Sequence, residues 1–223
     1  MESIFRGDLS TRRGRAVAWV DSLLIDHAAL RLIWRNWGVV VPGVLYRSSH
    51  PTPGQLVRAR RQVGLRSLIN LRGATRSGSD ALSREQADRL DLTLLDIALS
   101  SGRAPDRATL VQLAETLHAA PKPALLHCKS GADRAAFASA VFILLNGGNA
   151  ADALGQMSLW HGHLRRSRAG VLDAVLLRYQ ATAEGRLSFR DWVTSAYDAD
   201  EITASFKAGG LSGFMQDRIL RRE

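Results

Sequence analysis

Short apolar runs alternate along this chain with longer segments whose apolar positions recur at helical spacing. The runs predict strands, because they are brief and bounded by turn residues such as Gly and Pro. Predicted strands cover residues 39–48 (two strands around a Pro-Gly turn), 65–71, 92–99 and 122–128. Predicted helices cover residues 52–64, 83–90, 108–119, 135–145, 150–160 and 170–183. Strands that alternate with helices predict an α/β fold with a central, largely parallel sheet flanked by helices.

A further helical stripe precedes the first predicted strand. From Val17 to Trp37 the apolar residues recur at near-helical spacing, and Arg31 and Arg35 fall on other faces. This pattern predicts an amphipathic helix. Its apolar members are Val20, Leu23, Leu24, Leu30, Trp34 and Trp37. We expect this helix to pack against the domain, with peripheral contact to a membrane surface as the alternative.

Composition limits the number of domains and the cellular locations that the sequence allows. With 223 residues, of which 46% are hydrophobic, the chain can bury one good core. A single cysteine excludes an internal disulfide framework. The basic N-terminus lacks an apolar stretch followed by a cleavage site, so we expect no secretory signal. The most apolar stretch, Ala135–Leu145, is shorter than the roughly 18 residues of a membrane span. We expect a cytoplasmic protein, with a position at the inner membrane surface as the alternative.

The net charge of +9 favours an anionic partner. Only 6% of the residues are aromatic and no nucleic-acid-binding motif is present, so we expect no nucleic-acid partner. Phosphorylated substrates and anionic lipids remain. The densest basic stretch, "HGHLRRSR" at 161–168, is either a contact for a polyanionic substrate or a solvated face. Its two His residues, at i and i+2, do not match a helical zinc pair, so we expect no metal there.

The lone cysteine lies in "HCKSGADR", residues 127–134, between a predicted strand and an apolar predicted helix. Gly131 and its small neighbours let the backbone curl, so that several N–H groups point at one centre, and the helix adds its positive dipole end. These features bind phosphate and stabilise a thiolate at Cys128. Arg134 supplies a planar fork for two phosphate oxygens. The predicted phosphate-binding residues are Lys129, Ser130, Gly131, Ala132, Asp133 and Arg134.

"HCKSGADR" resembles the Cys-x5-Arg signature loop of the protein tyrosine and dual-specificity phosphatase superfamily. The stretch "VPGVLYRSSHPTPGQL…VGLRSLINLRG" is similar to the opening of the atypical dual-specificity phosphatases of bacteria, fungi and plants, and we place the chain in the bacterial branch. The resemblance spans roughly residues 38–180. It implies a protein tyrosine phosphatase-like fold and a phosphomonoester hydrolase that needs no cofactor and no metal. Cys128 would attack phosphorus, giving a phosphocysteine that water hydrolyses.

The resemblance also implies a division of the chain and supporting roles at the site. It places a basic, amphipathic N-terminal extension at 1–37, the phosphatase domain at 38–183 and a C-terminal extension at 184–223. His127 would orient the loop through hydrogen bonding. Lysines at the position of Lys129 are familiar in relatives that act on inositol phosphates or phosphoinositides; the alternative is that Lys129 faces solvent.

Three aspartates compete to protonate the leaving group. In many members of the superfamily the acid lies on a separate loop upstream of the cysteine, where Asp96 and Asp106 are found. Asp106 is also explained as a helix N-cap. Asp133 matches the acid of myotubularin-like lipid phosphatases and of some bacterial phosphatases; its alternative is a purely structural bond within the loop. We favour Asp133, then Asp96, then Asp106.

One position departs from the superfamily pattern. A Ser or Thr that helps the sulfur leave is usual after the loop Arg, but here that residue is Ala135. The departure predicts slow hydrolysis of the phosphocysteine, unless Ser130 substitutes. We expect a tyrosine or dual-specificity-type phosphatase of broad specificity. The alternatives are an inositol polyphosphate or phospholipid phosphatase, and a weakened phosphate-binding module. The partners would then be a phosphoprotein, an inositol phosphate or a phospholipid.

Overall fold

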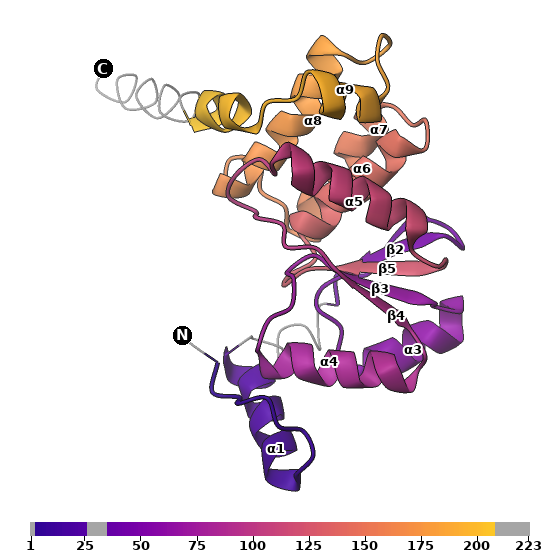
Figure 1. Cartoon of the computed structure of the whole chain (residues 1–223), viewed down its shortest axis with the longest axis vertical. Coiled ribbons are helices and arrows are strands. Elements are labelled where there is room, and N and C mark those ends of the chain that lie inside the picture. Colours follow the sequence, from indigo (N-terminus) through magenta and orange to yellow (C-terminus); the bar gives the residue numbers. More distant parts are fainter. Residues whose placement is uncertain (1–2, 26–34, 208–223) are drawn as a thin grey trace.

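A central sheet organises the chain in the computed structural model, which describes residues 3–25 and 35–207. The strand order is β1-β2-β5-β3-β4 (Figure 1). β1 pairs antiparallel with β2, and the other neighbours pair in parallel. The strands are β1 (Gly38–Val41), β2 (Leu45–Ser48), β3 (Ser67–Asn70), β4 (Thr93–Asp96) and β5 (Ala124–His127). The predicted α/β fold with a largely parallel sheet is therefore confirmed.

Helices cover both faces of this sheet. In Figure 1, α3 (Pro53–Val63) and α4 (Gly78–Arg89) lie below the sheet, and α5 (Arg107–Ala119) and α6 (Arg134–Leu145) lie above it. Strand residues alternate between the two layers, as a pleated strand requires. Leu68 and Leu125 belong to the core between the sheet and the helices α3 and α4. Their neighbours Ile69 and Leu126 belong to the core around α6, on the other face. β3 and β5, in which every residue is buried, therefore carry apolar residues toward both faces.

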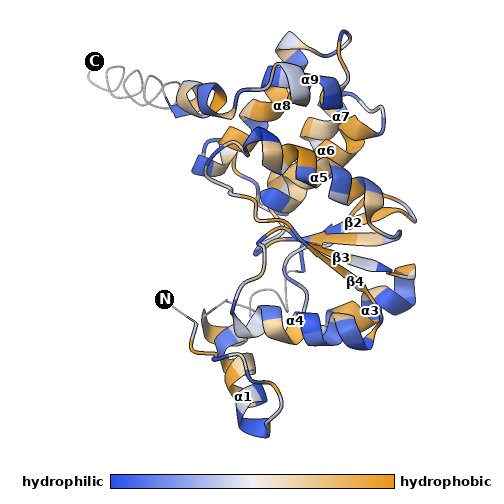
Figure 2. Cartoon of the chain, in the orientation of Figure 1, coloured by the Kyte–Doolittle hydropathy of each residue, from blue (hydrophilic) through white to orange (hydrophobic). Residues whose placement is uncertain are grey.

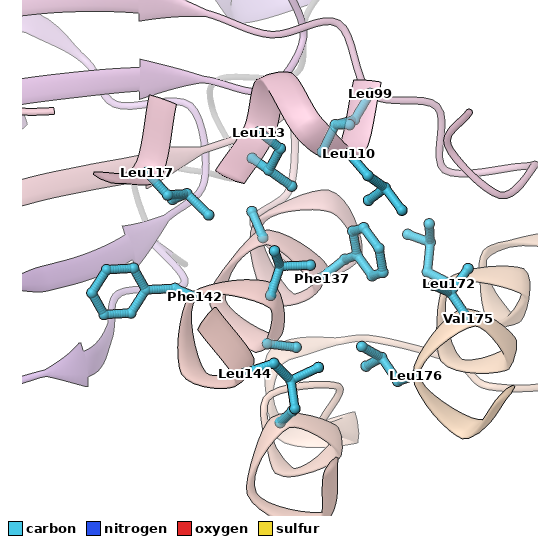
Figure 3. Close-up of a cluster of buried hydrophobic side chains, with 14 of the residues drawn as sticks. Leu99, Leu110, Leu113, Leu117, Phe137, Phe142, Leu144, Leu172, Val175 and Leu176 are labelled. Carbon is cyan, nitrogen blue, oxygen red and sulfur yellow. The ribbon is translucent and has the colours of Figure 1, made fainter. Parts of the chain in front are cut away.

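The larger core surrounds α6, which is apolar nearly all round because neighbours enclose it. Its residues Phe137 and Val141 are completely buried. Leucines of α5 and of α8 (Val171–Thr182) pack around Phe137 and Phe142 (Figure 3). Figure 2 shows the corresponding apolar colouring along α5 and α6, with polar residues interspersed on α5. The helix that follows the cysteine loop is thus fixed on several sides, which gives the loop a rigid support.

The C-terminal helices continue this core. Phe189 and Trp192 of α9 (Phe189–Ser195) are buried in the same cluster as α6. Arg107 of α5 donates to the carbonyl oxygens of Thr194 at 2.6 Å and Tyr197 at 2.8 Å. The core therefore extends past residue 183, while the proposed boundary at 184 remains a prediction about domain organisation. Residues 199–207 are also helical.

One predicted helix, 150–160, ends early. α7 covers only Ala150–Gly155, and Leu159–His161 forms a separate 3-10 turn, η2. Ser158 starts that turn, because its hydroxyl accepts from the Trp160 N–H at 3.2 Å. A second 3-10 turn, η3 (Arg168–Gly170), leads into α8. The predicted helix at 83–90 is in turn the end of a longer one, since α4 begins after its N-cap Ser77.

The helix predicted from Val17 to Trp37 needs a correction. α1 spans Arg12–Val20, its N-cap Thr11 accepting from the Gly14 N–H, and a π-helical turn, η1, follows over Asp21–Ile25. Residues 35–37 are not helical, and Asn36 has a positive φ of 48°. Two residues of the predicted stripe, Leu30 and Trp34, lie outside the described residues.

α1 packs against the start of α4. The Asp21 carboxylate accepts from the Gly78 N–H at 2.7 Å and from the Ile4 N–H at 2.8 Å. A Cβ at Gly78 would lie only 2.3 Å from the Ala18 carbonyl oxygen, so glycine is needed for this close approach. The described part of the N-terminal helix therefore packs on the domain. No helix in 3–25 or 35–207 combines the length and apolar character that crossing a bilayer demands.

Candidate active site

The cysteine loop lies at the carboxyl end of β5, where parallel α/β sheets place their ligands. Cys128 directly follows β5 and is buried. The Gly131 N–H donates to the Cys128 Sγ across 3.2 Å. Gly131 has a φ of +77°, and a Cβ there would lie 2.7 Å from the backbone of Ser48 and Ser49. Only glycine fits, so the loop curls as the sequence predicts and turns an N–H toward the sulfur.

A buried arginine supports the loop from behind. Arg47 of β2 donates through Nη2 to the Gly131 carbonyl oxygen at 3.0 Å and through Nη1 to the Gln156 carbonyl oxygen at 2.8 Å. Burial lowers the pKa of Arg47 to about 10, while the charges of Cys128 and Asp133 oppose that shift. Arg47 therefore stays cationic at neutral pH and favours negative charge at the loop.

Two more contacts brace the loop. The Asn36 Nδ2 donates to the carbonyl oxygens of Ser130 and His161, both at 2.8 Å. The His50 N–H donates to the Lys129 carbonyl oxygen at 3.2 Å. The first contact fixes Asn36, which has a positive φ and is not helical. Segments before β1, after β2 and after α7 thus converge on one loop.

The remaining predicted loop residues differ in exposure. His127 is buried, and its ring packs edge-on against His50 with centroids 4.6 Å apart; its role in orienting the loop stays a prediction. Arg134 and Lys129 are half-buried, and Ser130 is exposed. The Arg134 Nη1 lies 3.5 Å from the Leu99 carbonyl oxygen, a long contact for a hydrogen bond.

Asp133 lies at the N-cap position of α6, yet its side chain caps no helix N–H. Its Oδ1 instead accepts from the His163 Nδ1 at 2.7 Å. The His163 Nε2 donates to the Asp173 Oδ2 at 2.5 Å, and Arg165 Nε donates to the Asp173 Oδ1 at 2.9 Å. We call the hydrogen-bonded residues Asp133, His163 and Asp173 the Asp–His–Asp network. It joins the cysteine loop to the start of α8.

The central residue of this network, His163, is charged at neutral pH. His163 is buried, which by itself lowers its pKa, but the hydrogen bonds to Asp133 and Asp173 and their negative charges outweigh burial and raise the pKa to about 9. Both ring nitrogens then donate, as the two carboxylates require. Sequence reasoning missed this residue and assigned its segment to a substrate contact or a solvated face.

The other two candidate acids lie in different surroundings. Asp96 ends β4, where its Oδ1 accepts from Asn70 Nδ2 at 2.9 Å and from Arg84 Nη2 at 2.7 Å. Asp106 is the N-cap of α5, as predicted, and accepts from the Thr109 N–H at 2.7 Å. That backbone hydrogen bond lowers the pKa of Asp106. Of the three, Asp133 is the one within the cysteine loop itself.

The departure at Ala135 has a structural setting. Ala135 is completely buried in the first turn of α6. Its carbonyl oxygen accepts from the Ser139 hydroxyl at 2.7 Å. The hydroxyl of Ser130 accepts from the Ala132 N–H at 3.3 Å, which is a contact within the loop.

Among the described residues, no group of three or more His, Cys, Asp or Glu side chains is arranged to hold a metal ion.

The fold and the family match place this chain among the cysteine-dependent phosphatases of the protein tyrosine and dual-specificity superfamily. More narrowly, the chain belongs to the PTP-SAK family: the model described as the Swiss Army Knife protein, DSP-PTPase phosphatase domain, matches residues 34–203. No curated protein matches the sequence.

Solved structures are similar in fold. TpbA of P. aeruginosa is 19% identical with a TM-score of 0.53, over 77% of this chain and 91% of that chain. The DUF442 structure from Shewanella putrefaciens CN-32 is 19% identical with a TM-score of 0.52, over 68% of this chain and 94% of that chain. A TpbA variant in complex with pTyr is 20% identical with a TM-score of 0.50, over 67% and 92% of the two chains.

Proposed function

We propose that this chain hydrolyses phosphomonoesters through a phosphocysteine on Cys128, with tyrosine or dual-specificity-type activity of broad specificity. The observation that carries the proposal is the loop between β5 and α6, in which the Gly131 N–H is directed at the buried sulfur. Arg47, cationic behind the loop, favours the thiolate. Arg134, Lys129 and the loop amides hold the phosphate oxygens.

The reaction then proceeds in two displacements. The Cys128 thiolate attacks phosphorus, the S–P bond forms, and the P–O bond to the alcohol breaks. Asp133 donates a proton to the departing oxygen. Water next attacks phosphorus, gives a proton back to Asp133, and the S–P bond breaks to restore the thiolate. Because position 135 is alanine, no hydroxyl there assists the second displacement, so we expect that step to be slow.

Asp133 remains the favoured acid because it lies within the cysteine loop, and its hydrogen bond to His163 fixes its orientation. With Oδ1 held at 2.7 Å by His163, Asp133 has one fixed oxygen and one oxygen left for the leaving group. The imidazolium favours the carboxylate form of Asp133, so it assists release of the proton and opposes its uptake. Asp96 is the alternative; its Oδ1 is likewise bound, by Arg84 and Asn70, but it lies at the end of β4 and not in the cysteine loop. We therefore assign His163 and Asp173 as positioning residues.

Replacing His163 by Gln tests this assignment. For substrates with poor alcohol leaving groups, we expect kcat/KM to fall roughly 10-fold to 100-fold, because the acid is no longer held in place. For an activated aryl phosphate, whose leaving group needs no proton, we expect little change. The matched control is His118→Gln, on the exposed surface of α5. An equal loss on both substrate classes would mean that His163 is only structural.

A comparison of phosphate release from three substrates tests the specificity. We expect a phosphotyrosine peptide to be hydrolysed fastest, followed by an inositol polyphosphate and an anionic phospholipid. The TpbA complex with pTyr supports the first, whereas Lys129 and the net charge of +9 support the other two as alternatives. If none releases phosphate while the protein still binds vanadate, the chain is a phosphate-binding module.

A further inference from the structure

A group of large apolar side chains projects from the molecule beside the cysteine loop. Trp160 is 92% exposed, Leu159 71% and Leu164 56%. These three residues lie within six positions of each other, between α7 and α8. Single exposed apolar residues are ordinary on a protein surface, but three large ones so close in sequence, one of them a nearly fully exposed tryptophan, point to an interaction surface.

Hydrogen bonds of His161 and His163 fix the backbone that carries these side chains, so the fold itself keeps the side chains exposed. His161 accepts from Asn36 Nδ2 through its carbonyl oxygen at 2.8 Å, and its Nδ1 lies 2.7 Å from the Asn36 Oδ1. Burial and the nearby charge of Arg47 lower the pKa of His161, so this ring is neutral. His163 is fixed between two carboxylates. The exposed apolar residues therefore flank two histidines that are anchored to the protein.

Cations follow the apolar group directly. Arg165, Arg166 and Arg168 are exposed, and the sequence holds no Asp or Glu between Met157 and Leu172. Of these arginines, Arg165 pairs with the buried Asp173. Exposed tryptophan and leucine beside the exposed Arg166 and Arg168 fit a phospholipid surface, since the rings and alkyl groups enter the interface while guanidinium groups bind lipid phosphates. Charge complementarity thus favours an anionic bilayer over a neutral one.

The same surface borders the active site. A hollow of about 570 Å³ is lined by the apolar residues Met157, Leu159 and Leu164 and by Arg165 and Arg166. His163 also lines it, and His163 binds Asp133 of the cysteine loop. A bilayer in contact with this surface would therefore lie next to the phosphate-binding loop.

We propose that residues 159–168 dock the enzyme on an anionic lipid bilayer and hold its active site at the membrane surface. The docking segment is distinct from the N-terminal helix, whose described part packs on α4. This proposal does not depend on which phosphomonoester is hydrolysed. It predicts that substrates embedded in or attached to an anionic membrane are reached more readily than the same groups in solution.

Co-sedimentation of the full chain with vesicles tests the proposal. We expect binding to vesicles of phosphatidylcholine mixed with phosphatidylglycerol, and little binding to phosphatidylcholine alone. Trp160→Ser should weaken binding to the anionic vesicles by about 10-fold, because a tryptophan no longer enters the interface. Arg166→Glu should weaken it by a similar factor. The matched controls are Leu187→Ser and Arg61→Glu, which alter exposed residues far along the chain from this segment.

Activity on a water-soluble aryl phosphate separates this proposal from the proposed function. Both variants should keep that activity, because neither residue touches the cysteine loop. Two results would overturn the docking proposal: wild-type protein that stays in the supernatant with anionic vesicles, or equal vesicle binding by Trp160→Ser and Leu187→Ser. If Trp160→Ser lowers only the hydrolysis of a phosphoprotein, the segment docks a protein instead. If the wild-type protein binds anionic vesicles but does not hydrolyse the aryl phosphate, that result counts against the proposed function and not against docking.

Discussion

Replacing Cys128 by Ser should abolish phosphate release, lowering kcat by roughly 10,000-fold or more. A serine hydroxyl is scarcely ionised at neutral pH and is a poor leaving group, so neither displacement can proceed at a useful rate. The substitution is nearly isosteric and Cys128 is buried beside Gly131, so the fold should be retained. Steady-state hydrolysis of an aryl phosphate measures the effect, and thermal unfolding checks the fold.

A suitable control for this experiment is Ser139→Ala, which alters a buried hydroxyl one turn into α6 without touching the sulfur. It should leave most of the activity in place. If the folded Cys128→Ser variant retained activity within 10-fold of the wild type, the nucleophile would have to be another residue, and the assigned roles in the loop would be wrong.

Replacing Arg134 by Lys should have the second largest effect, a fall in kcat/KM of about 100-fold to 1,000-fold. Lysine keeps the charge but loses the planar fork that binds two phosphate oxygens at once, and this geometry matters most in the transition state. The measurement is hydrolysis of the same aryl phosphate over a range of concentrations. Both kcat and the affinity for vanadate should decrease.

Arg103→Lys provides the matched comparison for Arg134, because Arg103 is exposed on the loop before α5 and the change is the same. It should behave as wild type. Arg134→Lys activity equal to that of Arg103→Lys would show that the phosphate is held by other groups, such as Lys129 and the loop amides.

The elements of the sheet were predictable because their signals are local. Buried parallel strands such as β3 and β5 appear as short apolar runs, and Thr52 and Asp106 cap the helices α3 and α5. One error involves contacts that are distant in the sequence. Asn36 belongs to the predicted helical stripe but has a positive φ, and its Nδ2 donates to the carbonyl oxygens of Ser130 and His161, which are 94 and 125 residues away.

The same distinction holds at the candidate site. Cys128 and Arg134 were identifiable because a single contiguous loop carries the phosphate-binding geometry. The residues that support this loop come from elsewhere in the chain: His163 is 30 residues from Asp133, and Arg47 is 84 residues from Gly131. Sequence spacing gives no indication of these pairs, since only the fold brings β2 and the segment after α7 to the carboxyl end of β5.

The most direct test of whether Cys128 forms a phosphocysteine is the intact mass of the protein after a rapid denaturing quench during turnover. Because Ala135 offers no hydroxyl to assist hydrolysis, the phosphocysteine should accumulate. We predict an added phosphoryl group that maps to the peptide containing Cys128 and is missing in Cys128→Ser. An adduct on a different residue, or turnover by the wild type that persists unchanged in Cys128→Ser with no adduct on Cys128, would contradict the account.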